Sequence, residues 1–369
     1  MKIGILTSSR ADYGIYLPLL RKLEIDPYFK TEIIAFGTHL SESHGYTLNH
    51  IKNDGFKTIH TVSSLGDDDS QYGIAASYGN TVLKFAAFWK ANIYDLVFCL
   101  GDRFEMSAAV QASIPYGVFL AHIHGGETTL GAIDNIYRHQ LTLASKLHFV
   151  ATLAYKVKVE QLTENSNLVF NVGALSLDGI KKFKPLDKQE LFSAFNVKDQ
   201  PFALVTFHPE TVAVERNREF ASQMRLALEA LTVLLQIVVT MPNADTLGGV
   251  YRKELMKLKE HVPDKVVLVE NFGKQNYFTA MHYCRLLLGN TSSGIIEAAS
   301  FKKYVVNVGK RQKGRAQSEN TFDVDFNAEH IVNKVKTIME LPVFKGENVY
   351  YKAGTAEGII QTIKTYDKL

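Results

Sequence analysis

The stretch VFLAHIHGGETTLGAID, residues 118–134, decides the fold. It begins with the apolar run 118–121 and then changes abruptly to histidine, glycine and acidic residues. A short apolar run that ends in this way is typical of a strand buried on both faces of a parallel sheet. Ligands of such sheets bind beyond the carboxyl ends of the strands. The stretch therefore predicts an α/β fold with polar groups of a site at a strand end.

Short apolar runs alternate with segments of helical periodicity along the whole chain, as in sheets whose parallel strands are joined by crossover helices. We expect strands near residues 3–8, 30–37, 57–62, 96–100, 118–122, 147–150, 168–172, 202–207, 237–241, 266–269, 286–288 and 304–308. The predicted fold is two Rossmann-like, doubly wound α/β domains facing a cleft.

The domain boundary is expected in residues 181–200, a lysine-rich segment that contains Pro185 and lacks a long apolar run. We therefore expect an N-terminal domain over residues 1–180, a linker over 181–200 and a C-terminal domain over 201–352. Residues 353–369 include helical spacing and are expected to form a helix that crosses back onto the first domain.

The composition excludes several classes of protein. The chain has 369 residues, 46% hydrophobic and 21% charged, which suffices for two hydrophobic cores. Its net charge of +3 comes without a basic run of the kind that follows a nucleic-acid backbone, and no run approaches the length of a membrane span. The opening MKIGILTSS fits a first strand better than a secretory signal. Cys99 and Cys284 lie in apolar runs, which favours buried free thiols and a cytoplasmic protein.

The histidines and acids of the opening stretch allow two interpretations. His122, His124 and Glu127 resemble the ligand sets that bind first-row metals. The same groups could instead transfer protons, since imidazole and carboxylate are the common general acids and bases.

Two other strand ends in the first half carry polar groups. The motif SSRADYG enters a helix, where Arg10 and backbone amides could hold a phosphate; a capped helix with a solvated arginine is an equal alternative. The motif GDRFE places Asp102 and Arg103 where a structural ion pair explains them as well as catalysis does.

The strand ends of the second half indicate a nucleotide. The motif TFHPE places His208 where it can donate a hydrogen bond to phosphate oxygens, although a buried structural histidine is an alternative. The motif GNTSSG opens a helix with Ser292 and Ser293, which could bind an anion or simply cap the helix. Glu297, one turn further on, could accept both hydroxyls of a ribose. Neither GxxxxGK[ST] nor a GxGxxG after the first strand is present, so the usual fingerprints of ATP hydrolysis and nicotinamide binding are missing.

Taken together, the motifs SSRADYG, GDRFE, HGGE with the following GAID, TFHPE and GNTSSGIIE resemble those of the hydrolysing UDP-N-acetylglucosamine 2-epimerases in order and approximate spacing. Each motif is weak alone, but five in order over residues 2–315 are specific, and the chain most resembles the bacterial sialic-acid-pathway branch. The resemblance implies a glycosyltransferase B-type fold with UDP held mainly by the second domain and the sugar in the cleft. It also implies no metal, no nicotinamide cofactor, no nucleic-acid or membrane partner, and a homodimer or homotetramer.

The resemblance also implies roles for single residues. The diphosphate would be held by Arg10, His208, Ser292 and Ser293, the ribose by Glu297, uracil by backbone around Phe272, and further polar contacts would come from Asn243 and Arg311. The reaction would convert UDP-N-acetylglucosamine and water to N-acetylmannosamine and UDP. UDP-N,N'-diacetylbacillosamine is the alternative substrate on this branch.

The chemistry of this substrate calls for two proton-transfer groups. The proton at C2 is not acidic, but departure of UDP from C1 acidifies it, so elimination to 2-acetamidoglucal comes first and hydration follows. Asp102, Glu127 and Asp134 are the available carboxylates. Several relatives have an acidic residue where this chain has His124, so the base is either Glu127 or His124. We favour Glu127 and Asp102 as the proton-transfer groups, with Asp134 supporting; His208 completes the candidate catalytic set.

Basic residues near these acids have expected supporting roles. Arg103 is expected to pair with carboxylates of the cleft, and Arg138 and His139 to cap the helix that begins at Asp134. Two rival functions share much of the pattern: a UDP-sugar glycosyltransferase and a catalytically silent nucleotide-sugar sensor.

Overall fold

The chain forms two compact units in the computed structural model, which describes residues 1–369 except 43–44, 69, 131–132, 211–213, 243–247 and 367–369. The first unit comprises residues 1–127, 134–179 and 350–369, and the second comprises residues 128–133 and 180–349. Each unit has its own parallel sheet and its own hydrophobic core.

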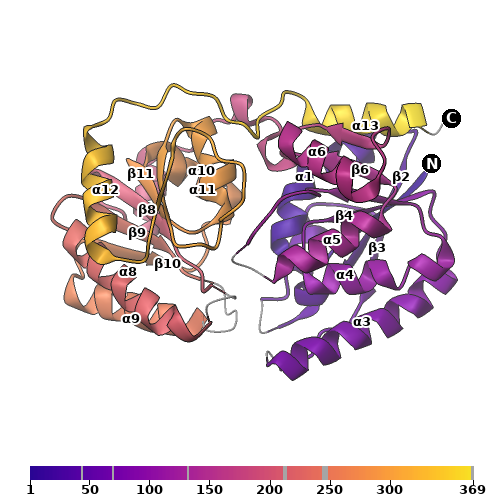
Figure 1. Cartoon of the computed structure of the whole chain (residues 1–369), viewed down its shortest axis with the longest axis horizontal. Helices are drawn as coiled ribbons and strands as arrows, with labels where there is room; N and C mark the ends of the chain where they lie inside the picture. Colours follow the sequence, from indigo (N-terminus) through magenta and orange to yellow (C-terminus); the bar gives the residue numbers. More distant parts are fainter. Residues whose placement is uncertain (43–44, 69, 131–132, 211–213, 243–247, 367–369) are drawn as a thin grey trace. The chain divides into compact units, whose positions relative to one another are not determined.

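The sheet of the first unit has seven parallel strands in the order β3-β2-β1-β4-β5-β6-β7 (Figure 1). The strands are β1 (Lys2–Thr7), β2 (Lys30–Phe36), β3 (Ile59–Val62), β4 (Leu96–Leu100), β5 (Leu120–Ile123), β6 (Leu147–Val150) and β7 (Val169–Asn171). Its longer helices are α1 (Arg10–Ile25), α2 (Leu48–Asn53), α3 (Gln71–Ala91), α4 (Phe104–Gln111), α5 (Asp134–Ala144), α6 (Leu153–Thr163) and α13 (Thr355–Tyr366). The order reverses between β1 and β4, the position where ligands of doubly wound sheets usually bind.

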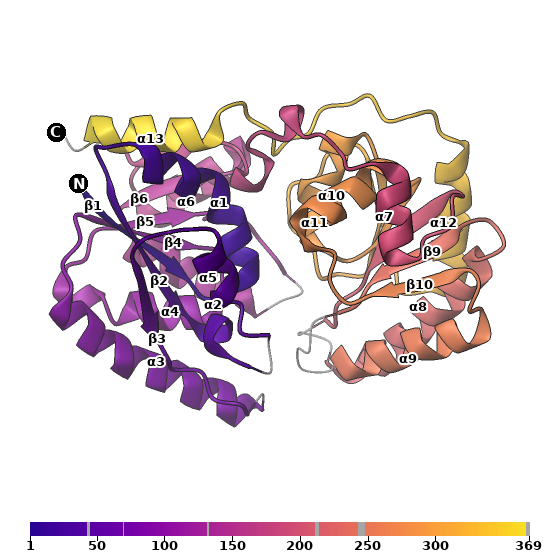
Figure 2. The same ribbon diagram turned by 180° about the vertical axis from the view of Figure 1, so that it is seen from behind.

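Helices cover both faces of this sheet. One face packs against α1, α2 and α13, and the other against α3, α4 and α5. Helix α13 turns Ile359, Ile360 and Ile363 into the core, a spacing that places them on one helical face. The last helix of the chain therefore lies beside α1 (Figure 2), within the unit that also contains the first strand.

The sheet of the second unit has six parallel strands in the order β10-β9-β8-β11-β12-β13. The strands are β8 (Phe202–Thr206), β9 (Gln236–Thr240), β10 (Val266–Val269), β11 (Leu286–Gly289), β12 (Tyr304–Val308) and β13 (Thr321–Val324). The helices are α7 (Lys188–Phe195), α8 (Asn217–Leu231), α9 (Gly248–His261), α10 (Gly273–Tyr283), α11 (Ser292–Ile296) and α12 (Ala328–Glu340). Helices α8, α9 and α12 pack on one face, and α7 and α10 on the other.

The doubly wound α/β class is confirmed, and each of the twelve predicted strands overlaps an observed one. Strand β13 was not predicted, because its residues TFDV alternate too briefly and lie half exposed at the sheet edge. The expected linker 181–200 instead contains α7, whose Leu191 and Phe192 are buried in the core of the second unit. Residues 350–352, expected in the second domain, belong to the first unit.

Within the described ranges, no helix combines the length and the apolar character needed to cross a bilayer.

Candidate active site

The polar groups predicted in the first unit follow two neighbouring strands. Strands β4 and β5 pair in parallel, with Leu100 opposite Ile123. Asp102 comes two residues after the end of β4 and His124 directly follows β5. Because parallel strands end at the same edge, the loops that carry these two side chains start side by side.

A buried arginine contacts these groups. Arg138 of α5 is 2% exposed and makes an ion pair with Asp102. Its Nη1 donates to the carbonyl oxygen of His124 over 2.9 Å and lies 3.8 Å from Oε2 of Glu127. The structure thus brings Asp102, His124 and Glu127 together around one guanidinium.

His124 and Glu127 form a buried pair. Nδ1 of His124 lies 2.5 Å from Oε1 of Glu127, and the two side chains are 7% and 2% exposed. Nε2 of His124 is buried and has no hydrogen-bond partner in the described part of the chain. Within the described ranges, the pair therefore leaves one imidazole nitrogen without a protein partner.

The two glycines of HGGE let the loop fold back tightly enough to form this pair. Gly126 has φ +78°, and a Cβ atom there would lie 2.7 Å from the carbonyl oxygen of Tyr155 in α6. A larger residue would push the loop away from α6, so the turn that returns Glu127 to His124 depends on glycine.

His122 has a different role from its neighbour His124. It is fully buried, with Nε2 3.1 Å from the carbonyl oxygen of Gly101 and Nδ1 3.2 Å from the hydroxyl of Thr142. Burial, with His148 close by, lowers the pKa of His122 to about 3. Because both ring nitrogens contact protein atoms, His122 is not available as a ligand beside His124. Among the described residues, no three His, Cys, Asp or Glu side chains converge as a metal site requires.

Of the basic residues of this region, Arg138 differs from its expected role, whereas Arg103 does pair with a carboxylate. Arg138 does not cap α5: it lies in the middle of the helix and points at Asp102. Arg103 pairs with Glu105, two residues further on, with Nη2 to Oε1 at 2.8 Å. The role of Arg138 beside Asp102 was not indicated by the sequence, because an arginine four residues after Asp134 resembles an ordinary surface helix pair.

The turn before α1 matches the capped-helix interpretation in its geometry. Ser9 is the N-cap in a capping box with Asp12, whose carboxylate accepts from the backbone NH groups of Ser8 and Ser9. Arg10 is exposed and makes no hydrogen bond or ion pair with the described residues. Asp134 begins α5 and is partly buried.

In the second unit, a buried asparagine joins three strand-end loops. Asn290 is fully buried; its Oδ1 accepts from the NH of His208 over 2.7 Å, and its Nδ2 donates to the His208 carbonyl over 2.8 Å. The carbonyl of Asn290 accepts from Arg311 and from Gln312. Asn290 therefore ties together the loops after β8, β11 and β12. Nothing in its motif had marked it, since Asn is common in turns.

Gly289, just before Asn290, allows this close approach. Its φ is +144°, and a Cβ atom would lie 1.8 Å from the carbonyl oxygen of Thr206. Only glycine fits where β11 passes this close to β8.

His208 is partly buried beside these loops. Burial, together with the positive charge of Arg311, lowers the pKa of His208 to about 3. The imidazole is therefore neutral at physiological pH and can donate one hydrogen bond and accept another.

The serines of GNTSSG are not the helix cap. The N-cap of α11 is Thr291, whose hydroxyl accepts from the NH of Ser293, so Ser292 and Ser293 are the first two helical residues. The Ser293 hydroxyl oxygen is buried without a hydrogen-bond partner in the described ranges. Glu297, at the end of this short helix, is 8% exposed.

Tyr277 of α10 is a further residue of this region that the sequence did not indicate. Burial is the main cause that raises its pKa, to about 12, and the nearby Glu297 carboxylate raises it further, while the hydroxyls of Ser293 and Thr206 oppose the rise. Phe272 is buried against Phe195, with ring centroids 4.5 Å apart. Asn243 lies outside the described residues.

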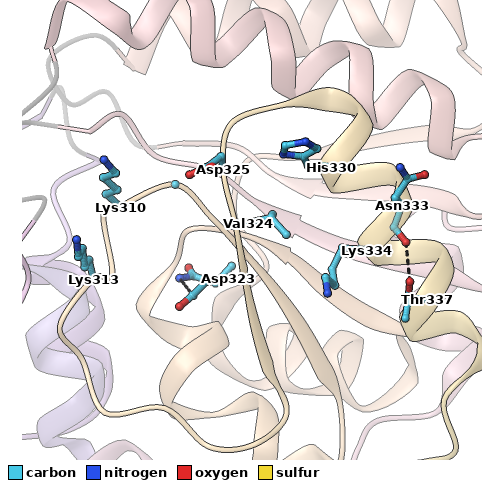
Figure 3. Close-up of a pocket in the computed structure, with 11 residues that line it drawn as sticks. Lys310, Lys313, Asp323, Val324, Asp325, His330, Asn333, Lys334 and Thr337 are labelled. Carbon is cyan, nitrogen blue, oxygen red and sulfur yellow. Dashed lines mark hydrogen bonds between the residues drawn. The ribbon is translucent and has the colours of Figure 1, made fainter.

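A separate pocket of about 600 Å³ lies at the edge of the second unit (Figure 3). It is lined by residues at the ends of β12 and β13 and along α12: Asn307, Gly309, Lys310, Lys313, Asp323, Val324, Asp325, His330, Asn333, Lys334 and Thr337. None of the predicted site residues lines it. Most of its lining side chains are exposed, so it is a polar surface depression rather than an enclosed site.

Known proteins resemble this chain along nearly its whole length. Residues 21–364 match the family model described as UDP-N-acetylglucosamine 2-epimerase. A Legionella pneumophila protein named UDP-N,N'-diacetylbacillosamine 2-epimerase (hydrolyzing) is 33% identical, over 99% of this chain and 96% of its own. The polysialic acid biosynthesis protein P7 of Escherichia coli is 30% identical, over 100% of this chain and 94% of its own. The crystal structure of Neisseria meningitidis UDP-GlcNAc 2-epimerase bound to UDP-GlcNAc superposes with a TM-score of 0.83 at 18% identity, covering 99% of this chain and 100% of that one, which shows a shared fold.

Proposed function

The chain belongs to the UDP-N-acetylglucosamine 2-epimerase family, and we propose that it is a hydrolysing 2-epimerase of a UDP-activated 2-acetamido sugar. The observation that carries this proposal is the convergence of Asp102, His124 and Glu127 around the buried Arg138. A site that only binds a nucleotide sugar has no need for a buried imidazole–carboxylate pair beside a second, ion-paired carboxylate.

The proposed reaction has two steps. In the first, a base takes the proton from C2, the C2–H electron pair forms a double bond between C1 and C2, and the C1–O bond breaks with its electron pair leaving on UDP. In the second, water adds to the 2-acetamidoglucal: its hydroxyl joins C1 while an acid delivers a proton to the opposite face of C2. The products are UDP and a free sugar with inverted C2.

The groups of the first unit supply the proton transfers in this proposal. Asp102, Glu127, His124 and Asp134 are the candidate acids and bases. Arg138 holds Asp102 in place through their ion pair, and burying that arginine without a partner would be costly. General acid–base groups of this kind typically contribute about 10²–10⁴-fold to a rate.

The second unit supplies the UDP site in this proposal. His208, Ser292 and Ser293 contact the diphosphate; Arg311 adds charge, and Glu297 binds the ribose hydroxyls. Support comes from Asn290, which ties the His208 and Arg311 loops to the loop that leads to Ser292. A preorganised site of this kind loses less entropy on binding.

UDP-N-acetylglucosamine and UDP-N,N'-diacetylbacillosamine are the two candidate substrates. The sequence motifs favoured the first; the relative that is 33% identical carries the name of the second. Both undergo the same chemistry at C1 and C2 and differ at C4 and C6. The ratio of kcat/KM for the two, measured side by side, identifies the physiological substrate.

The test is incubation of the pure protein with each UDP-sugar in heavy water, without an acceptor. We expect release of UDP and of a free sugar with the manno configuration that carries one solvent deuterium at C2, seen by proton NMR. Free sugar without C2 deuterium would mean simple hydrolysis and would overturn the proposal. Binding without turnover of either sugar would identify a sensor or a glycosyltransferase that awaits its acceptor.

A further inference from the structure

The two members of the buried His124–Glu127 pair have different positions relative to their neighbours. We propose that His124, through Nε2, is the group that removes the proton at C2, and that Glu127 is a positioning residue that acts through His124. This inference rests on the proposed function and reverses the order that the sequence favoured, in which Glu127 was the base.

The contact between the two side chains determines which imidazole nitrogen carries hydrogen. Nδ1 of His124 is 2.5 Å from Oε1 of Glu127, and an ionised carboxylate can only accept. Nδ1 therefore donates, and in the neutral ring Nε2 keeps its lone pair. This is the tautomer that a general base needs, and it is held by a carboxylate as in Ser-His-Asp triads.

The surroundings of the pair leave Nε2 as the available atom. Oε1 of Glu127 is engaged by the imidazole, and its Oε2 faces the Arg138 guanidinium at 3.8 Å. Both oxygens of Glu127 thus already face a partner within the protein. Nε2 of His124, by contrast, is buried and has no hydrogen-bond partner among the described residues. An unpaired buried nitrogen is costly unless a ligand completes it.

The backbone of His124 is unusual in a way that fits a functional position. Its φ is +66°, in the left-handed region that non-glycine residues rarely adopt. The conformation is held from both sides, since its NH donates to the carbonyl of Phe149 and its carbonyl accepts from Arg138. Such strain is kept where the surrounding structure enforces it, commonly at active sites.

The proposed step is balanced within the substrate and the pair. The C2 proton passes to Nε2, the C2–H electron pair forms the C1=C2 bond, and the C1–O pair leaves with UDP. The resulting imidazolium is stabilised by Glu127, which stays ionised. After hydration, in which a different acid protonates C2, His124 returns its proton to solvent.

The deciding experiment compares His124→Gln with Glu127→Gln in steady-state kinetics over pH, with folding checked by melting temperature and UDP affinity. We expect His124→Gln to lower kcat by at least about 10³-fold. Glu127→Gln should lower kcat by only about 10–100-fold, because the imidazole base remains but is less basic and less well held. The acidic limb of kcat/KM in Glu127→Gln should therefore move to lower pH.

Complete loss of turnover in Glu127→Gln, with His124→Gln retaining measurable turnover and an acidic limb, would overturn the proposal and make Glu127 the base. His60→Gln is the matched control: His60 also pairs with a glutamate, Glu32, at 2.9 Å, and its loss should leave kcat and the pH profile unchanged. The wild-type assay in heavy water distinguishes a wrong assignment of the base from a wrong proposed function. If the wild type forms the deuterated sugar, the reaction holds and the variants test the pair alone; if it does not, the proposed function itself fails.

Discussion

In the proton-transfer region, Arg138 contacts three of the candidate residues at once. It is 2% exposed, yet it pairs with Asp102, holds the His124 carbonyl and faces Glu127. A charge buried this deeply persists because it pairs with a carboxylate and donates to a carbonyl oxygen. The positions of Asp102 and of the His124–Glu127 pair thus depend on one guanidinium.

Replacing Arg138 with methionine should leave the Asp102 and Glu127 carboxylates without their cation. We expect the free energy of unfolding to fall by about 3–5 kcal/mol, as for other broken buried pairs, and kcat to fall by more than about 100-fold. Urea unfolding and kinetics on the folded fraction measure the two effects. Arg225→Met is the control, because Arg225 also bridges two carboxylates, Glu229 and Glu254, in the second unit. If both variants kept normal turnover, Arg138 would be a purely structural residue.

Glu297 offers a second test at the scale of one side chain. A buried carboxylate that accepts both ribose hydroxyls would be worth about 1.5–3 kcal/mol for such charge-assisted bonds. Glu297→Ala should therefore weaken UDP binding by roughly 10–100-fold in calorimetry, converted at 1.4 kcal/mol per tenfold. Glu254→Ala, which removes a partly buried glutamate elsewhere in the second unit, should leave UDP affinity unchanged. UDP affinity unaffected by loss of Glu297 would remove it from the nucleotide site.

At the scale of elements, the second unit builds its candidate site from three loops rather than from one motif. The loops after β8, β11 and β12 carry His208, Ser293 and Arg311, and Asn290 connects all three. Gly289 permits the close passage of β11 against β8 that this connection requires. The loops are thus one cooperative element, although they come from separate parts of the chain.

Asn290→Ala should show this cooperation directly. The change leaves the buried NH and carbonyl of His208 without their partners, at about 1–3 kcal/mol for each unsatisfied group. We expect a lower melting temperature together with UDP binding weakened at least about tenfold, because the His208 loop loses its position. Asn320→Ala, which breaks a buried side-chain bond to the Lys303 carbonyl, should lower stability while UDP affinity stays normal. A similar loss of UDP affinity in both variants would contradict the role given to Asn290.

How much the sequence predicts also differs between elements. Strands such as β4, LVFCL, are buried along their whole length, so their apolar runs predict them directly. Strand β13 escapes prediction because its four residues sit at an edge and mix Phe322 with Asp323. Residues that follow strands, such as Asp102 and His208, can be predicted as site candidates because strand ends meet at one edge. Arg138 and Asn290 cannot, because their importance lies in partners that only the folded chain brings near.

For the whole molecule, buried neutral histidines link stability to pH. Burial lowers the pKa of His122 to about 3 and that of His148 to about 4, below the ordinary value of 6.5. Between pH 6.5 and about 4, the unfolded chain binds protons at these positions that the folded chain does not. Stability should therefore be complete above about pH 7 and be lost progressively as the pH falls toward 4.

Urea unfolding between pH 7.5 and pH 5 checks this expectation. Each of the two histidines should contribute a loss of up to about 2 kcal/mol at pH 5, from 1.36 kcal/mol per pH unit below 6.5. His148→Gln should reduce the slope of the unfolding free energy against pH by the contribution of one proton. His330→Gln, which removes an exposed imidazole, should keep the wild-type slope. An unchanged slope in His148→Gln would show that its burial does not govern the acid response.

The placement of α13 has a consequence for how the protein is made. Ile359, Ile360 and Ile363 complete the core of the unit that starts with β1, yet the ribosome adds them only after the whole of the second unit. During synthesis the second unit can fold as soon as it emerges. In the first unit, the apolar surface beside α1 stays uncovered until α13 is made. The nascent chain is therefore exposed to chaperones and proteases at its beginning until its last helix arrives. Mutations in α13 should reduce yield in cells more than they reduce activity per folded molecule.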